Sequence, residues 1–145
     1  DATLDAFVVG IGTGGTFTGV GQVLRETLPE VYLAAVEPSR SAALSGGEIR
    51  RHGIEGIGAG FVPANVDRSL LDEVLSCDDK VAADTSARLA AEEGVSAGLS
   101  GGAAVWAAVE VARRLGAGKR VVTVIPDAWD RYATDEMVHP ARTGL

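Results

Sequence analysis

Short apolar runs alternate along this chain with longer stretches in which apolar residues recur at helical spacing. We expect strands at the apolar runs, which are residues 6–10, 31–36, 73–77 and 120–125, with a further short strand near 95–98. We expect helices at the periodic stretches, which are residues 16–27, 79–93 and 102–115, with a last short helix from about 129 to 138. This order predicts an α/β fold with an open, mostly parallel sheet and helices on both faces.

Two segments stand out from this alternation. Residues 120–125 are apolar and end at Pro126, which is typical of a buried central strand in a parallel sheet. Residues 39–65 contain six glycines and form a longer connection than α/β units normally use. Long connections in compact domains usually serve a function, so we expect residues 39–65 to contribute to a site.

The composition fits one α/β domain over residues 1–145, because 46% hydrophobic residues in a chain of this length can bury a core. A net charge of −7 argues against a nucleic-acid partner. No apolar run approaches the roughly 18 residues that a membrane span needs. Cys77 is the only cysteine, so an internal disulfide is impossible and a reducing cytoplasmic location is expected. The sequence contains no cluster of Cys and His residues that would predict a metal site.

The start of the sequence is unusual. The chain begins with Asp1 rather than Met, its only methionine is Met137, and the first expected strand begins at residue 6. We interpret the sequence as a segment of a longer protein. A trimmed but complete small domain is the alternative.

The clearest candidate site is a glycine-rich turn between the first strand and the first helix. It comprises Gly12, Thr13, Gly14, Gly15 and Thr16. Backbone N–H groups of such a turn, together with the positive end of the helix dipole, form a binding site for a phosphate group. The alternative is a tight turn that binds nothing.

A second glycine-rich turn precedes the third helix and contains Ser100. Ligands of parallel α/β sheets bind at the carboxyl ends of the strands, where both turns are expected to lie. Taken alone, Ser100 is as readily interpreted as a helix cap.

Other polar residues give weaker signals. Glu37 and Pro38 have no chemistry that the sequence alone assigns. His52 and His139 are isolated histidines that we expect to be solvated, and Cys77 is expected to belong to the core. Lys80 and Lys119, the only lysines, occupy positions that usually face water.

Several of these motifs together resemble the cysteine synthase (O-acetylserine sulfhydrylase) family. They are residues 12–16 (GTGGT), Glu37-Pro38 with Ser41, residues 56–65 (GIGAGFVPAN), Glu93-Gly94 and residues 98–100 (GLS). The resemblance extends from about residue 5 to residue 132. It implies a pyridoxal 5′-phosphate enzyme of fold type II, of which this chain would be the large C-terminal domain.

The resemblance also implies roles for individual residues. Gly12, Thr13, Gly14, Gly15 and Thr16 would bind the phosphate of the cofactor, and Ser100 would face its pyridine nitrogen. Gly56, Ile57 and Gly58 would belong to a loop that helps the site close over the substrate. A small amino acid would be the substrate, and the complete protein would be a homodimer.

Two departures from the family pattern matter. In the family, the lysine that binds the cofactor covalently lies in the N-terminal half, and neither lysine of this chain has a matching sequence context. We therefore expect a complementary N-terminal segment as partner and no activity from this chain alone. Pro126 and Asp127 resemble the related cystathionine β-synthases, and Gly101 stands where the family commonly has a second serine. A cystathionine β-synthase-like or O-phosphoserine-using enzyme, or a non-catalytic module that binds a phosphate-bearing ligand, therefore remain alternatives to cysteine synthesis.

Overall fold

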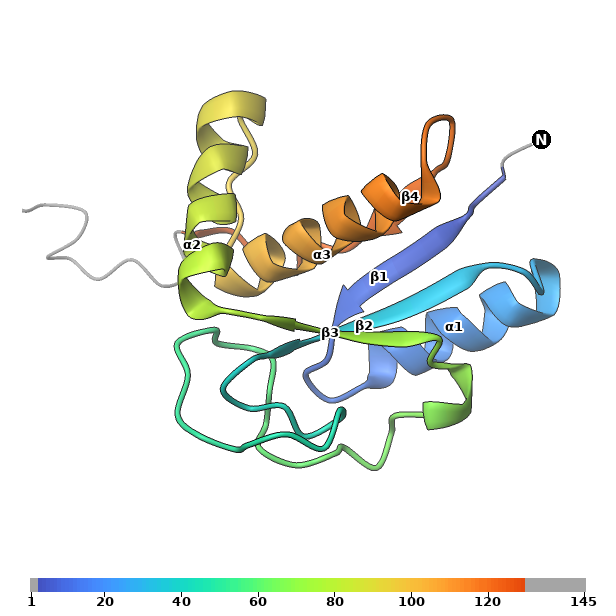
Figure 1. Ribbon diagram of the computed structural model, residues 1–145, viewed down its shortest axis with the longest axis horizontal. Helices are drawn as coiled ribbons and strands as arrows, with labels where there is room; N and C mark the ends of the chain where they lie inside the picture. The colour runs from blue at the N-terminus through green and yellow to red at the C-terminus, as the bar shows by residue number, and fades with distance from the viewer. Residues whose placement is uncertain (1–2, 130–145) are drawn as a thin grey trace, which may run out of the picture.

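The computed structural model describes residues 3–129 of the chain (Figure 1). The strands are β1 (Ala6–Gly10), β2 (Tyr32–Pro38), β3 (Glu73–Cys77) and β4 (Val121–Thr123). The helices are α1 (Gly15–Thr27), α2 (Asp79–Arg88) and α3 (Leu99–Leu115), with a short 3-10 helix η1 (Arg68–Leu70) and a π-helical turn η2 (Leu89–Glu93).

The four described strands form one parallel sheet in the order β3-β2-β1-β4. β1 and β2 are paired along their length, from Ala6 opposite Tyr32 to Gly10 opposite Val36. Parallel strands require crossover connections. Helices supply two of them, with α1 between β1 and β2 and with α2 and α3 between β3 and β4, whereas the long irregular connection with η1 joins β2 to β3. The predicted α/β fold with a parallel sheet is confirmed.

Side chains of β1 alternate between two cores on opposite faces of the sheet. Ala6 and Val8 pack with residues of α2 and α3, whereas Phe7 and Val9 pack with Phe17 of α1. Figure 1 shows the same division, with α1 on one side of the strands and α3 on the other. Because both faces are covered, the inner strands β1 and β2 are apolar apart from Glu37 near the end of β2.

The expected strand near 95–98 is wrong. This segment has no regular secondary structure, and it pairs with no strand of the described sheet. Gly94 ends the preceding helix with φ 68°, and Gly98 donates to the carbonyl of Asp127 at 3.1 Å. The segment is apolar because it packs under α2 and α3, where Ala97 is buried.

The prediction of a central strand at 120–125 is also wrong. β4 has only three residues, pairs only with β1 among the described strands, and leaves the side chain of Val122 42% exposed. Two helix boundaries differ as well, since α3 begins at Leu99 rather than at 102 and the helix that starts at Asp79 becomes π-helical from Leu89. The expected helix from about 129 to 138 lies, apart from its first residue, outside the described residues.

The long connection between β2 and η1 covers the carboxyl end of the sheet. It has almost no regular structure, apart from one antiparallel bridge between Ser41 and Ile49. Its residues from 54 to 58 return to the end of β1, where Gly58 donates to the carbonyl of Ile11 at 3.1 Å. Within residues 3–129, no helix combines the length and the apolar character that crossing a bilayer requires.

Candidate functional site

The glycine-rich turn links the end of β1 to an open helix start. Gly14 adopts φ 85° immediately before α1, no side chain caps this helix, and its first turn contains no acidic residue. The first amides of a helix have no partner within the helix, and its dipole favours negative charge at this end. These features suit an anion such as a phosphate, so the phosphate site stays a prediction that this helix start is compatible with.

Two glycines of the turn are required by the chain's own packing. A Cβ atom at Gly12 would lie 2.5 Å from the carbonyl oxygen of Gly56, and one at Gly14 would lie 2.3 Å from Cγ2 of Val66. A Cβ at Gly15 would meet only Thr13 Oγ1, at 3.8 Å. The glycine pattern thus allows residues 56–66 to lie directly against the turn, in addition to leaving its amides accessible.

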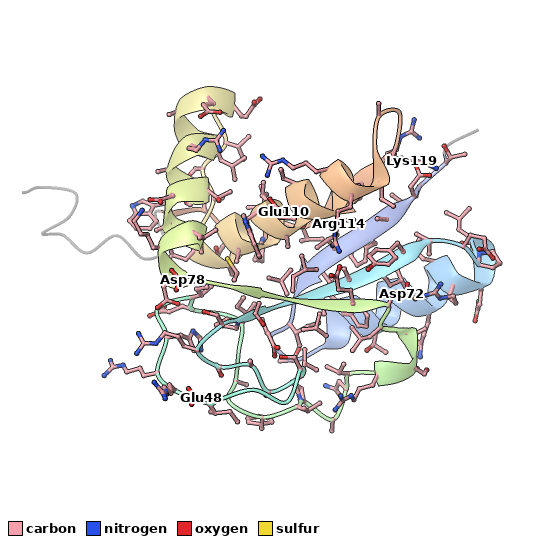
Figure 2. All side chains as sticks on the ribbon, viewed as in Figure 1. Glu48, Asp72, Asp78, Glu110, Arg114 and Lys119 are labelled. Carbon is pink, nitrogen blue, oxygen red and sulfur yellow. The ribbon has the colours of Figure 1, made fainter. Side chains whose placement is uncertain are left out.

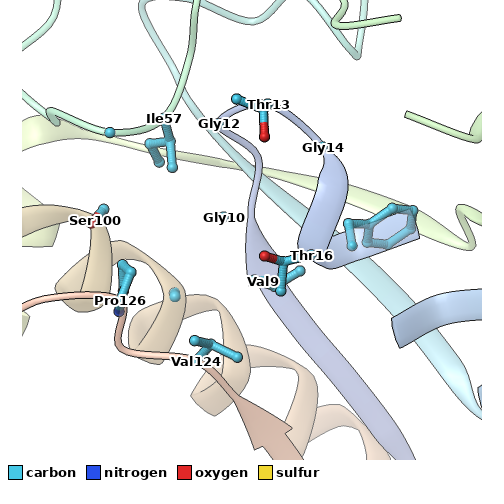
Figure 3. Close-up of a pocket in the computed structure, with 13 residues that line it drawn as sticks. Val9, Gly10, Gly12, Thr13, Gly14, Thr16, Ile57, Ser100, Val124 and Pro126 are labelled. Carbon is cyan, nitrogen blue, oxygen red and sulfur yellow. The ribbon is translucent and has the colours of Figure 1, made fainter. Parts of the chain in front are cut away.

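A cavity of about 260 Å³ lies between this turn and the start of α3 (Figure 3). It brings together all of the predicted site residues except Gly15 and Gly58, namely Gly12, Thr13, Gly14, Thr16, Gly56, Ile57 and Ser100. Figure 3 shows Ser100 across the cavity from Thr16, with Ile57 between Ser100 and the turn. The sequence did not predict the apolar lining, which comprises Val9, Phe17, Ala104, Val124 and Pro126 together with Gly10.

Ser100 is the polar group that most clearly points to a ligand. Its side chain is only 3% exposed, and its Oγ has no hydrogen-bond partner within residues 3–129. It is the second residue of α3, whose N-cap is Gly98 and whose start has no side-chain cap, so the interpretation of Ser100 as a helix cap is wrong. An unpaired buried hydroxyl is costly, and at a cavity wall it indicates a partner on a bound molecule.

A second hollow of about 510 Å³ adjoins the first. The two share Gly12, Thr13, Gly56 and Ile57, so one thin wall of turn and loop separates them. The second hollow is otherwise lined by residues between 59 and 65, including Phe61, which is 63% exposed. The loop around Gly56 is therefore placed where its position controls the shape of both hollows.

Two side chains hold different parts of the long connection, Glu37 its start and His52 the loop around Gly56, and neither role was predicted from the sequence. Glu37 at the end of β2 is 2% exposed, and its carboxylate accepts hydrogen bonds from the amides of Leu44 at 2.8 Å and Ser45 at 3.2 Å. His52 is half-buried rather than solvated, since its Nε2 lies 2.9 Å from the carbonyl oxygen of Gly58. Only the contact of Glu37 has a signal in the sequence, which is a glutamate directly after a run of apolar residues.

The two lysines do not reach the cavity. Lys80 is exposed and pairs with Asp84, and this hydrogen bond raises the pKa of the amine. Lys119 pairs with Asp5 at 2.9 Å, at the opposite end of β1 from the glycine turn (Figure 2). A nucleophilic amine must lie beside the ligand, and neither lysine lines the cavity, so neither has the position of a catalytic amine.

The remaining candidate chemistry is structural. Cys77 is fully buried, and burial raises the pKa of its thiol to about 12, so the expectation of a core cysteine is supported. Within the described part of the chain, no three His, Cys, Asp or Glu side chains are grouped so that they could bind a metal ion.

Known proteins resemble this chain in both sequence and structure. A cysteine synthase of Staphylococcus aureus is 46% identical over 130 residues, which are 90% of this chain and 42% of the relative. The crystal structure of an O-ureido-L-serine synthase, 44% identical, superimposes with a TM-score of 0.87 over 99% of this chain and 45% of the other. An O-acetylserine-dependent cystathionine β-synthase from Helicobacter pylori, 41% identical, gives a TM-score of 0.84 over 89% of this chain and 42% of the other.

These matches cover nearly all of this chain but less than half of each relative, so the chain spans about two fifths of the length of the proteins it resembles. The protein family described as "Pyridoxal-phosphate dependent enzyme" matches residues 1–127. The chain therefore belongs to this family of pyridoxal-phosphate-dependent enzymes, and its resemblance to the cysteine synthases is confirmed.

Proposed function

We propose that this chain is the C-terminal portion of a pyridoxal-phosphate-dependent β-replacement enzyme that makes L-cysteine from an O-activated serine and sulfide. The observation that carries the proposal is the cavity in which the unpaired, buried hydroxyl of Ser100 faces the uncapped start of α1. One end of this cavity suits a phosphate and the other end offers a hydrogen-bonding hydroxyl, as a phosphorylated pyridine requires.

The residues of the chain divide the work of binding. The amides of residues 12–16, with the hydroxyls of Thr13 and Thr16, hold the phosphate, and Ser100 Oγ forms a hydrogen bond with the pyridine nitrogen. When bound, the cofactor supplies an electron sink that stabilises negative charge on the substrate's α-carbon. Because the hydroxyl of Ser100 is neutral, it leaves the pyridine nitrogen unprotonated, which makes a mild sink suited to β-elimination.

The loop residues complete the pocket from the other side. Gly56 and Ile57 form the wall between the two hollows, where they orient the ligand and exclude water, and Gly58 anchors that wall to the end of β1. Neither lysine of the chain lines the cavity, so a complementary segment N-terminal to this one supplies the covalent amine and the site for the substrate carboxylate. In this proposal the chain alone is inactive.

Mixing tests the proposal. The chain is combined with the N-terminal segment of the full-length protein and pyridoxal 5′-phosphate, and visible absorbance is recorded. The absorbance band of the covalently bound cofactor is expected to be stronger for the mixture than for the two parts measured separately and added, and a mixture without this excess would rule out the proposal. In the same mixture Ser100→Ala is expected to shift this band, because the hydrogen bond to the ring is removed, whereas Ser96→Ala provides a control on the preceding segment.

A second β-replacement reaction is the alternative. Pro126 lines the cavity, and the next residue, Asp127, accepts a hydrogen bond from Gly98 at the start of α3, so the segment that resembles cystathionine β-synthases borders the site. Product analysis of the full-length protein with sulfide and with homocysteine distinguishes the two reactions. Cysteine as the main product supports the first reaction, and cystathionine supports the alternative.

A further inference from the structure

The carbonyl group of Gly58, in the loop wall of the cavity, is held by two side chains. Its oxygen lies 2.9 Å from His52 Nε2 and accepts a hydrogen bond from Ser41 Oγ at 3.2 Å. A carbonyl oxygen can only accept, so Nε2 of His52 carries the proton and donates. Two side chains from separate parts of the long connection thus hold the same backbone atom.

The other side of Gly58 is fixed equally closely. Its amide donates to the carbonyl of Ile11 at 3.1 Å, and its φ of +70° is accessible mainly to glycine. A Cβ atom there would lie 2.5 Å from the ring of Pro38 and 3.0 Å from Nε2 of His52. Gly58 is therefore enclosed by the end of β1, the end of β2 and the imidazole.

This attachment sets the position of Gly56, two residues earlier. A Cβ atom at Gly12 would lie 2.5 Å from the carbonyl oxygen of Gly56, so these two glycines are in close contact. A Cβ at Gly56 would lie 3.8 Å from Ser100 Oγ. A displacement at Gly58 therefore moves Gly56 relative to both the glycine-rich turn and Ser100.

We propose that His52 is a positioning residue, which together with Ser41 holds the Gly58 carbonyl and so keeps residues 56–58 between the two ends of the cofactor cavity. This inference rests on the proposed function for its consequence in binding. The hydrogen bonds themselves do not depend on that function. The imidazole does not line either hollow, so its effect on the ligand passes through the loop.

Amide hydrogen exchange of the full-length protein, resolved for residues 56–58, tests the inference without a ligand. His52→Leu removes the donor, and we expect about fivefold faster exchange at these amides, which corresponds to the loss of one hydrogen bond. His52→Gln retains an N–H donor and is expected to restore most of the protection. Arg51→Leu, at the exposed neighbouring residue, is the control and is expected to leave exchange unchanged.

The outcomes separate this inference from the proposed function. Unchanged exchange at residues 56–58 in His52→Leu, or no rescue by His52→Gln, would overturn the positioning role whatever the protein binds. Faster exchange across the whole chain would also overturn it, because it would show a general loss of stability. If the exchange results are as expected, weaker binding of pyridoxal 5′-phosphate by His52→Leu than by His52→Gln supports the link to the cofactor. A wild-type protein that binds no pyridoxal 5′-phosphate would refute the proposed function but not the positioning role.

Discussion

Replacement of Glu37 by glutamine should destabilise the chain far more than its single-atom change suggests. Both carboxylate oxygens of Glu37 are used. Oε2 accepts from the amide of Leu44 at 2.8 Å, and Oε1 accepts from the amide of Ser45 at 3.2 Å and also from its hydroxyl. A glutamine has one accepting oxygen, so in either orientation its NH₂ group faces a backbone N–H donor in a buried site.

The magnitude follows from the bonds that are lost. A hydrogen bond to a charged acceptor contributes about 1.5–3 kcal/mol, and one or two are lost, so we expect the free energy of unfolding to fall by roughly 2–4 kcal/mol. With a urea dependence of about 2 kcal/mol per molar, the unfolding midpoint should fall by about 1–2 M.

The assay is urea unfolding followed by circular dichroism. Glu55→Gln is the matched control, because Glu55 lies in the same long connection and is exposed, and it should change the free energy of unfolding by less than about 0.5 kcal/mol. If Glu37→Gln is as mild as this control, the carboxylate does not hold the start of the connection, and our account of how residues 39–65 are fixed is wrong.

Three further predictions follow from the same structure. Gly12→Ala should destabilise the chain by about 1–3 kcal/mol in urea unfolding, because the added Cβ would lie 2.5 Å from the carbonyl oxygen of Gly56. Gly19→Ala lies in α1, where the added Cβ would have no described atom within 4 Å, and should stabilise the chain by about 0.5–1 kcal/mol. Equal effects of the two substitutions would contradict the close approach at Gly12. Arg114 lowers the pKa of Glu73 in the folded chain, so the stability that Glu73 contributes is present above pH 4.5 and is lost as the pH falls through the lowered pKa. The thermal unfolding midpoint of Glu73→Gln should therefore depend less on pH below 4.5 than that of the wild type. Identical pH profiles of the two proteins would refute this. The thiol of Cys77, with its pKa raised to about 12, should react with iodoacetamide at pH 8 only after unfolding, and rapid labelling of the folded chain would show that it is not buried.

The strands that the sequence predicted correctly are those whose environment can be inferred locally. Residues 6–10 and 73–77 match β1 and β3, since each is a short apolar run bounded by glycine or charged residues. Residues 95–98 look the same in the sequence, yet they pair with no strand of the described sheet. An apolar run reports burial, and only the arrangement of the neighbouring elements decides whether a strand lies beside it.

The site was predictable in part for the same reason. The glycine turn and Ser100 carry local signatures of helix starts, and a parallel sheet brings such starts to one edge. The roles of Glu37 and His52 depend on partners that approach from other segments, and no local pattern specifies these partners. The close contacts at Gly12 and Gly58 were likewise invisible in the sequence, although both residues were identified.

Titration calorimetry with a matched pair of ligands measures whether this chain holds the phosphate of a pyridine cofactor. Pyridoxine 5′-phosphate and pyridoxine both lack the aldehyde, so neither can form adducts with Lys80 or Lys119. Two charge-assisted hydrogen bonds from the turn contribute about 3 kcal/mol or more. We therefore expect the chain to bind pyridoxine 5′-phosphate at least about a hundredfold more tightly than pyridoxine. Equal affinity for the two ligands, or no binding of either, would contradict the account.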